Sequence, residues 1–277
     1  MKMKRSEKLG MFTGLVVGVL LLLISVFMIF QTTCKVWGAE KPANATQQGI
    51  DVSSHQGKID WEQVKNSALA DYAIIRCGYG VNQTDKDDKY WDYNSSECER
   101  LGIPYGTYLY SGADTTAKAK SEAEHVVRLL QGKNLTYPIY YDMEADMLNQ
   151  LSSTQIGNIA KTFLNTMESY GYKNVAVYSN KYLFETKLTA SVFSDYPKWI
   201  AQHSNKCTYQ GSYHMWQYST QGVIPGISEK VDLNYKIGNW TYAGYSSAKK
   251  TVVVKPKATT TVSYTHLRAH ETDSYLV

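Results

Sequence analysis

Residues 137–146 read Tyr-Pro-Ile-Tyr-Tyr-Asp-Met-Glu-Ala-Asp, an apolar and aromatic run that ends in acids. Such a run predicts a short buried strand. Side chains alternate between the faces of a strand, so Tyr140, Asp142 and Glu144 are expected on one face and the residues between them on the other. The strand would therefore direct two carboxylates into one space.

Two carboxylates at the end of an apolar strand are costly, because a charged group loses its hydration there unless it binds a cation or takes part in chemistry. Paired carboxylates are what glycoside cleavage requires: one protonates the leaving oxygen and the other acts at the anomeric centre. The competing interpretation is a strand that runs into a solvated acidic loop. This stretch alone leaves both interpretations open.

Two further acids stand at the ends of predicted strands. Residues 49–53 form a short apolar run that contains Asp51, and residues 231–235 form another that contains Asp232. Together with the central pair, acids then occur at the first, a middle and the last strand of the folded region. This ordered spacing favours a shared site over four unrelated surface acids.

In these segments the chain resembles the lysozyme-like muramidases of glycoside hydrolase family 25, from about residue 49 to residue 238. The matching segments, in chain order, are GIDVSSHQG (49–57), IIRCGYG (74–80), YDME (141–144), WIAQ (199–202), WQY (216–218) and VDLN (231–234). Each motif alone is weak, but the ordered set is specific. The resemblance implies a somewhat irregular (β/α) barrel that hydrolyses peptidoglycan glycan strands without a metal or cofactor.

The rhythm of the sequence agrees with an α/β fold. Strands are predicted at residues 49–53, 72–78, 104–111, 138–144, 174–179, 197–202, 213–218 and 230–235, with amphipathic helical stretches between several of them. Asp114 is expected to cap one helix, and Ser153 or Thr154 another. Eight alternating strands favour a closed, TIM-barrel-like sheet with the four acids near the carboxyl ends of its strands. A flat doubly wound sheet is the alternative, but no Gly-rich phosphate loop follows the first strand.

The basic residues lie mainly at the ends of the chain. Residues 49–244 hold 18 Lys and Arg against 21 Asp and Glu, so nucleic-acid binding by this part is not expected. Residues 9–30 carry no charge and follow a basic segment, residues 1–8, which predicts one transmembrane helix with an extracellular catalytic domain. A cleaved signal peptide with secretion is the alternative, although the apolar run exceeds the usual length of a signal.

The remaining segments complete the predicted organisation. Residues 31–48 are interpreted as a polar stalk, residues 49–244 as the catalytic domain, and residues 245–277 as a disordered tail. Residues 262–277 look like a translated adapter and are not expected to be native. The four cysteines, Cys34, Cys77, Cys98 and Cys207, have no spacing typical of a disulfide framework or a zinc site.

The resemblance gives the acids distinct expected roles. Glu144 would be the general acid, kept protonated by an apolar and aromatic surrounding. Asp142 would be its partner, as a nucleophile, as a base, or as the residue that orients the acetamido group of the sugar; the spacing does not decide between these routes. Asp51 and Asp232 would support the site, with structural capping as the alternative for each.

Aromatic and amide side chains are the candidates for sugar contacts. Those expected to bind substrate are Tyr79, Tyr108, Tyr110, Trp199, Gln202, Trp216 and Gln217, each with a core or strand-end role as the alternative. Only one of Tyr108 and Tyr110 is expected to face inward. Arg76 is expected to pair with an inward acid.

Three other positions carry no expected role in the chemistry. His55 and His203 are interpreted as ordinary loop residues, because nothing in their spacing indicates a metal site. Leu109 stands where family members often have a histidine, which puts a substrate contact at this position in doubt.

The predicted function is hydrolysis of the β-1,4 bond between N-acetylmuramic acid and N-acetylglucosamine by a monomeric enzyme. The rivals are a hydrolase of chitin-like glycans and a non-catalytic wall-binding module. A binding module would need the aromatic residues but not Glu144.

Overall fold

The computed structural model describes residue 18, residues 39–241 and residues 245–246. None of the helices in this part of the chain is long and apolar enough to cross a membrane. The predicted span at residues 9–30 lies outside the described residues, except for Gly18. Nearly all of the predicted tail does as well.

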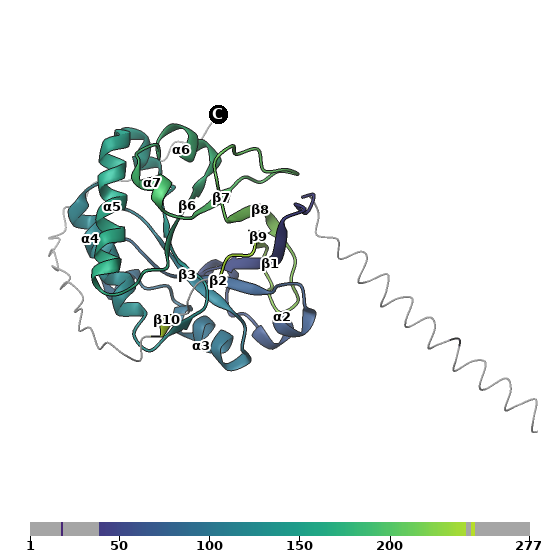
Figure 1. Cartoon of the computed structure of the whole chain (residues 1–277). Helices are drawn as coiled ribbons and strands as arrows, with labels where there is room; N and C mark the ends of the chain where they lie inside the picture. The colour runs from purple at the N-terminus through teal and green to yellow at the C-terminus, as the bar shows by residue number, and fades with distance from the viewer. Residues whose placement is uncertain (1–17, 19–38, 242–244, 247–277) are drawn as a thin grey trace, which may run out of the picture.

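Eight strands close into a barrel (Figure 1). In their order around the barrel they are β1 (Ala45–Val52), β2 (Tyr72–Tyr79), β3 (Tyr105–Tyr110), β5 (Ile139–Asp142), β6 (Val175–Asn180), β7 (Lys198–Ala201), β8 (Met215–Gly222) and β9 (Val231–Ile237). Neighbours from β1 to β8 pair in parallel, whereas β9 runs antiparallel to both β8 and β1. The predicted α/β class and the eight-stranded closure are confirmed, but the sheet is mixed and departs from the regular TIM-barrel repeat.

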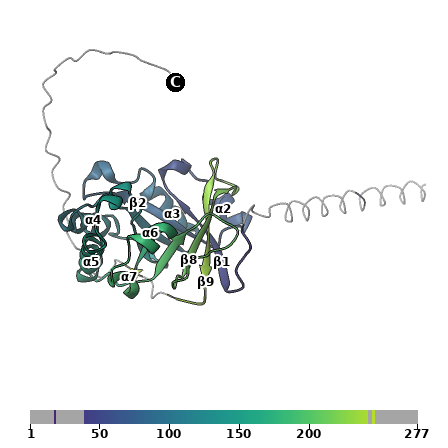
Figure 2. The same ribbon diagram turned by 90° about the horizontal axis from the view of Figure 1, so that it is seen from above.

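The helices cover mainly the first part of the barrel. They are α2 (Trp61–Ser67), α3 (Trp91–Leu101), α4 (Thr116–Leu129), α5 (Ser153–Ser169), α6 (Lys181–Thr186) and α7 (Val192–Asp195), with short 3₁₀ turns η1 (Ser54–Gln56), η2 (Thr84–Lys86) and η3 (Asp146–Gln150). No described helix follows β7, and a hairpin joins β8 to β9. Figures 1 and 2 show α4 and α5 side by side on one flank, away from β8, β9 and β1.

The observed helix caps lie one residue before or after the nearest predicted one. The Thr115 side chain caps α4 by accepting from the backbone N–H of Lys118, and Asp114 instead forms an ion pair with Lys118. Ser152 caps α5 and forms a reciprocal capping box with Gln155. A capping box satisfies two otherwise unpaired N–H groups, which explains why Ser152 is used in place of Ser153 or Thr154.

The strand alternation separates two buried layers. Tyr72, Ile74, Tyr140, Tyr178 and Trp199 pack together inside the barrel. The residues between them on the same strands belong to the larger layer that contacts the helices. The predicted alternation along residues 139–143 is confirmed, because Tyr140 lies in the inner layer while Ile139, Tyr141 and Met143 lie in the outer one.

The folded part begins earlier and ends later than predicted. Strand β1 starts at Ala45, so three of the last four residues assigned to the stalk, Ala45, Gln47 and Gln48, pair with β9. Strand β10 (Tyr245–Ser246) pairs with the short strand β4 (Asn134–Leu135), which brings the first two residues of the predicted tail into a second small sheet. Strand pairing at both ends therefore extends the domain beyond residues 49–244.

Candidate active site

Four acids meet in one pocket at the mouth of the barrel. Asp51 comes from β1, Asp142 from β5, Glu144 from the loop after β5, and Asp232 from β9. The pocket measures about 70 Å³ and is also lined by Tyr108, Tyr178, Trp199 and Gln217. It is smaller than sites that enclose whole ligands, which are typically about 300–1,000 Å³, so only part of a larger ligand would reach the acids.

Asp232 reaches this mouth by a different route from the one predicted. It is the second residue of β9, and its Cα lies opposite that of Asp51 in the antiparallel β1–β9 pair. The prediction that Asp232 stands near the carboxyl end of its strand is therefore wrong. Because β9 runs backwards, its amino end lies beside the carboxyl end of β1, and the acid arrives in the same place.

Asp51 is the most thoroughly hydrogen-bonded of the four acids. Its Oδ2 accepts from Asn234 Nδ2 at 2.7 Å and from Gln217 Nε2 at 3.0 Å. Asn234 is itself held by Trp199, whose Nε1–H donates to Asn234 Oδ1 at 2.8 Å. Burial raises the pKa of Asp51, while the bonds from Asn234 and Gln217 lower it. The arrangement fits an acid that is held in place by its neighbours.

Asp142 has the opposite environment. Asp142 is only 3% exposed, and its buried Oδ1 has no hydrogen-bond partner among the described residues. Burial raises the pKa of Asp142 well above its ordinary value, and the charges of Glu144 and Asp51 raise it further. An unpartnered buried carboxyl is costly, so this oxygen is available for a group that enters the pocket.

Glu144 and Asp232 complete the acidic lining. Burial and then the charge of Asp51 raise the pKa of Glu144, whereas a hydrogen bond from Tyr178 and the charge of His203 lower it. Burial and then the charge of Asp51 raise the pKa of Asp232 to about 8. Four carboxyls this close are not all ionised at once, because like charges in a desolvated pocket favour shared protons.

The aromatic walls come from three strands. Tyr108 and Tyr178 flank the Trp199 ring, with centroid distances of 6.3 Å and 4.4 Å from it. Tyr178 was not among the predicted site residues. Strand alternation would have found it, because Ser179 and Val177 on either side face away from the pocket, Ser179 donating to the Met143 carbonyl oxygen.

The expectation that only one of Tyr108 and Tyr110 faces inward is wrong. Residues two apart on a strand share a face, and Leu109 between them is buried in the outer layer. Tyr110 lies one step above Tyr108, opposite Asp142 in the β3–β5 pair. Burial raises the pKa of Tyr110, and the nearby charges of Asp142 and Glu144 raise it further. The outward direction of Leu109 also removes that position from the pocket.

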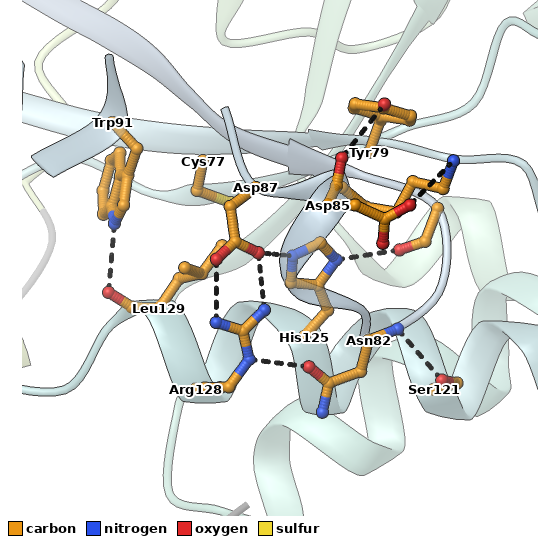
Figure 3. Close-up of polar contacts among 12 residues, drawn as sticks. Cys77, Tyr79, Asn82, Asp85, Asp87, Trp91, Ser121, His125, Arg128 and Leu129 are labelled. Carbon is orange, nitrogen blue, oxygen red and sulfur yellow. Dashed lines mark hydrogen bonds and ion pairs between the residues drawn. The ribbon is translucent and has the colours of Figure 1, made fainter. Parts of the chain in front are cut away.

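Four predicted sugar contacts lie outside the pocket lining, namely Tyr110, Trp216, Gln202 and Tyr79. Trp216 is completely buried in the outer layer and donates to the Gln202 carbonyl oxygen, so its ring offers no face to a sugar. The Gln202 side chain turns to Thr208, with bonds of 2.9 and 3.0 Å. Tyr79 is 38% exposed and its hydroxyl donates to the Asp85 carbonyl oxygen (Figure 3), with the Lys86 ammonium over its ring.

Gln217 lies in the pocket but its amide is occupied. Nε2 donates to Asp51 at 3.0 Å and, more weakly, to Asp232 at 3.4 Å. Oε1 accepts from the Tyr178 hydroxyl at 3.0 Å and contacts Nε2 of His203 at 2.9 Å. An amide has two donors and two acceptor sites, so Gln217 organises the pocket and has no unused N–H for a substrate hydroxyl.

Two further side chains reach the site from its edge. His203 is exposed, yet it contacts Gln217, so the interpretation of His203 as an ordinary loop residue is wrong. Arg76 pairs with Asp88 at 2.8 Å and donates to Ser54, and its charge lowers the pKa of Asp142. The expected ion pair of Arg76 is confirmed, with a partner from the loop after β2. Within the described residues, no group of three or more His, Cys, Asp or Glu side chains is arranged to hold a metal ion.

Comparison with known proteins gives a consistent family. A sequence model described as Glycosyl hydrolases family 25 matches residues 50–227. YegX of Escherichia coli strain K12, described as uncharacterized, is 27% identical over 199 residues, 70% of each chain. The autolytic lysozyme of Clostridium acetobutylicum is 30% identical over 188 residues, 68% of this chain and 55% of that protein.

A solved structure shows the same relationship in three dimensions. The modular autolysin LytC from Streptococcus pneumoniae, in complex with a synthetic peptidoglycan ligand, matches with 33% identity and a TM-score of 0.62. The match covers 68% of this chain and 46% of LytC, so the chain spans less than half of the length of that autolysin. Since the family match extends over most of the barrel, from β1 to the β8–β9 turn, the chain belongs to glycosyl hydrolase family 25.

Proposed function

We propose that this protein is a peptidoglycan hydrolase, an N-acetylmuramidase that cleaves the β-1,4 bond between N-acetylmuramic acid and N-acetylglucosamine. The observation that carries the proposal is the convergence of four acids with raised pKa values on one aromatic-walled pocket in a barrel of this family. The lysozyme and autolysin names of its relatives support the choice of substrate.

Glu144 is the proposed general acid. It is the partly exposed member of the Asp142–Glu144 pair, so it stands closer to an arriving glycosidic oxygen. Burial raises its pKa, which keeps a proton available for the leaving group. Once that proton has left, the Tyr178 hydroxyl and the charge of His203 stabilise the carboxylate that forms.

Asp142 is the proposed partner at the anomeric centre. Burial favours the neutral form of Asp142, and a substrate that places positive charge or an N–H donor against Oδ1 would favour the ionised form. Direct attack on the sugar, activation of a water and orientation of the acetamido group all need this carboxylate at this place. The anomeric configuration of the first product separates the inverting route from the other two.

Asp51 and Asp232 are proposed to support the reacting pair. Asp51 is anchored by Asn234 and Gln217, and Asp232 is held beside it through Gln217. The charge of Asp51 raises the pKa values of Asp142, Glu144 and Asp232. Asp51 therefore keeps protons in the pocket for the general acid.

The direct test is digestion of purified peptidoglycan with analysis of the new reducing ends. Loss of turbidity with N-acetylmuramic acid at the reducing ends is the expected result. Reducing N-acetylglucosamine as the product, or cleavage of chitin-like chains in preference to peptidoglycan, would contradict the muramidase assignment. Binding to the wall without any new reducing ends would identify a non-catalytic module.

The proposed location is the outer face of the cell membrane. The support is the uncharged run of residues 9–30 behind the basic segment 1–8. Full-length protein is expected to sediment with membranes and to resist carbonate extraction, whereas a chain that begins near Ala39 should be soluble and active. If expression of the full-length chain releases into the medium a protein that has been cleaved after residue 30, the apolar run is a cleaved signal.

A further inference from the structure

We infer that His203 is a positioning residue, which acts on the acid pocket through the side-chain amide of Gln217. This inference rests on the proposed hydrolytic function, which it deepens. His203 follows β7 and contacts Gln217 Oε1 through Nε2 at 2.9 Å. The amide oxygen only accepts, so Nε2 of His203 carries the proton and donates it.

The contact determines which way the Gln217 amide faces. With Oε1 held by His203 and by the Tyr178 hydroxyl, Nε2 of the amide faces Asp51 and Asp232. A flipped amide would place its oxygen against two carboxyls and its N–H₂ against a donor. The bond from His203 therefore keeps the two supporting acids beside each other on a shared donor.

The bond from His203 to Gln217 also affects which acceptor the Tyr178 hydroxyl can use. The Tyr178 hydroxyl has one proton and two acceptors within reach, Gln217 Oε1 at 3.0 Å and the Glu144 carboxyl. Because His203 also supplies a donor to Gln217 Oε1, Tyr178 can turn from this oxygen to Glu144 without leaving the oxygen unpaired. That donation has most value just after Glu144 has protonated the leaving group and carries a negative charge.

His203 also links the buried pocket to the solution. Its ring is exposed, whereas Gln217 is 3% exposed. The groups that face the ring or its amide partner are Asp51 from β1, Glu144 from the loop after β5, Tyr178 from β6 and Asp232 from β9. A protonated imidazole at this position lowers the pKa values of Asp51 and Glu144 through its charge.

The test uses substitutions that separate the donor from the charge. His203→Ala removes both, and His203→Gln keeps an N–H donor of similar reach without the charge. His55→Ala is the matched control, because His55 is another exposed histidine at the same mouth. We expect His203→Ala to lower kcat on peptidoglycan about 2- to 10-fold, the range for one lost hydrogen bond, with KM little changed. Its alkaline pH limb, where Glu144 loses the proton that it must donate, should move to higher pH.

The other variants complete the design. His203→Gln should recover kcat but keep the shifted limb, and His55→Ala should behave as the wild type. In a Gln217→Met background, His203→Ala should have almost no further effect, because its partner is absent. A full effect in that background, or a raised KM with unchanged kcat, would show direct action on substrate and overturn the inference.

A readout without substrate separates this inference from the proposed function. The ¹⁵N–¹H signal of the Gln217 side-chain amide should move in His203→Ala and return towards its wild-type position in His203→Gln. An unmoved signal in His203→Ala would overturn the inference even if the wild-type enzyme cleaves peptidoglycan. If the wild-type enzyme cleaves nothing but the signal moves as expected, the proposed function fails and the positioning contact stands.

Discussion

A group of four acids and a single aspartate lie at the same mouth of the barrel in opposite electrostatic environments. The acid pocket, formed by Asp51, Asp142, Glu144 and Asp232, has no cation among its lining residues. The single aspartate is Asp87, in the loop that follows β2. Arg128 of α4 donates to both oxygens of Asp87 at 2.9 and 2.5 Å, and His125 of α4 contacts it at 2.7 Å (Figure 3).

Nearly all polar side-chain atoms of the Asp87 cluster have a hydrogen-bond or ion-pair partner. Arg128 also donates to Asn82 at 2.7 Å, and the second ring nitrogen of His125 faces the Gly80 carbonyl oxygen at 3.0 Å. Both regions place carboxyls close to buried side chains, but only the Asp87 cluster pairs its carboxyl directly with cationic side chains. The cluster ties a loop to a helix, whereas the acid pocket retains groups that a substrate can satisfy.

The next residue along the loop joins the two regions. Asp88 accepts from Arg76 at 2.8 Å and from the backbone N–H of Ser54 at 2.9 Å. Adjacent aspartates thus face in different directions, Asp87 towards α4 and Asp88 towards the barrel mouth. Acid content alone therefore does not identify a functional site. The absence of a directly paired cation is what distinguishes the acid pocket from the Asp87 cluster.

The largest effect on activity is expected from Glu144→Gln in the acid pocket. This change keeps the size of the side chain but removes the transferable proton, and general acid catalysis typically contributes a factor of about 10²–10⁴. We expect kcat on purified peptidoglycan to fall by about that factor while wall binding persists. Glu229→Gln, the same change at an exposed position, is the control. Near-normal turnover by folded Glu144→Gln would assign the acid to another carboxyl.

Substitution of one aspartate in each region should destabilise the fold only at Asp87. Asp87→Asn leaves Arg128 and His125 without their charged partner, so the free energy of unfolding at pH 7 should fall by about 1–3 kcal/mol. Asp142→Asn removes a buried, unpartnered carboxyl, so the fold should be unchanged or more stable while turnover is lost. Denaturant unfolding measures both. Destabilisation by both changes would remove the distinction between the two regions.

The pH dependence of stability should carry the signature of the acid pocket. The pKa of Asp232 rises from 3.8 to about 8 in the folded state. A raised folded pKa favours the protonated form on folding, so this contribution is fully present below about pH 4 and is lost as the pH rises to about 8.

The melting temperatures of Asp232→Asn and the wild type across this window test that dependence. The variant should lose less stability than the wild type between pH 4 and pH 8. Asp92→Asn is the control, because the Asp92 side chain is 89% exposed. Parallel curves for Asp232→Asn and the wild type would show that Asp232 does not titrate in this window.

The smallest effect is expected from removing the end of the chain. Both regions lie within residues 51–232, and the last described pairing ends at Ser246. A chain that ends at Ser247 should therefore keep the melting temperature and the turnover of the full chain. A chain that ends at Thr241 loses β10 and should melt slightly lower with unchanged turnover. A fall of several degrees on ending at Ser247 would show that later residues contribute to the fold.

Much of the architecture could be predicted from the sequence, because it depends on local periodicity. The alternation in residues 137–146 placed Tyr140 and Asp142 on the inner face, and the strand–helix rhythm predicted an eight-stranded α/β barrel. The ordered motifs also indicated the family. These features depend on neighbours in the chain, where side-chain direction follows directly from strand geometry.

The direction of β9 and the orientation of individual side chains depend on contacts between residues that are distant in the sequence. Trp216 and Trp199 both read as aromatic strand residues, yet only Trp199 faces the pocket. The sequence predicted a substrate contact for Gln217 and an ordinary loop position for His203, whereas the structure shows a 2.9 Å contact between their side chains. Charge compensation is likewise a tertiary property: Asp87 meets Arg128 from 41 residues away, whereas Oδ1 of Asp142 meets no donor among the described residues. The sequence determined which strands carry acids, and only the closed barrel decided which acids are left uncompensated, because a carboxyl's environment is set by the strands and helices packed around it.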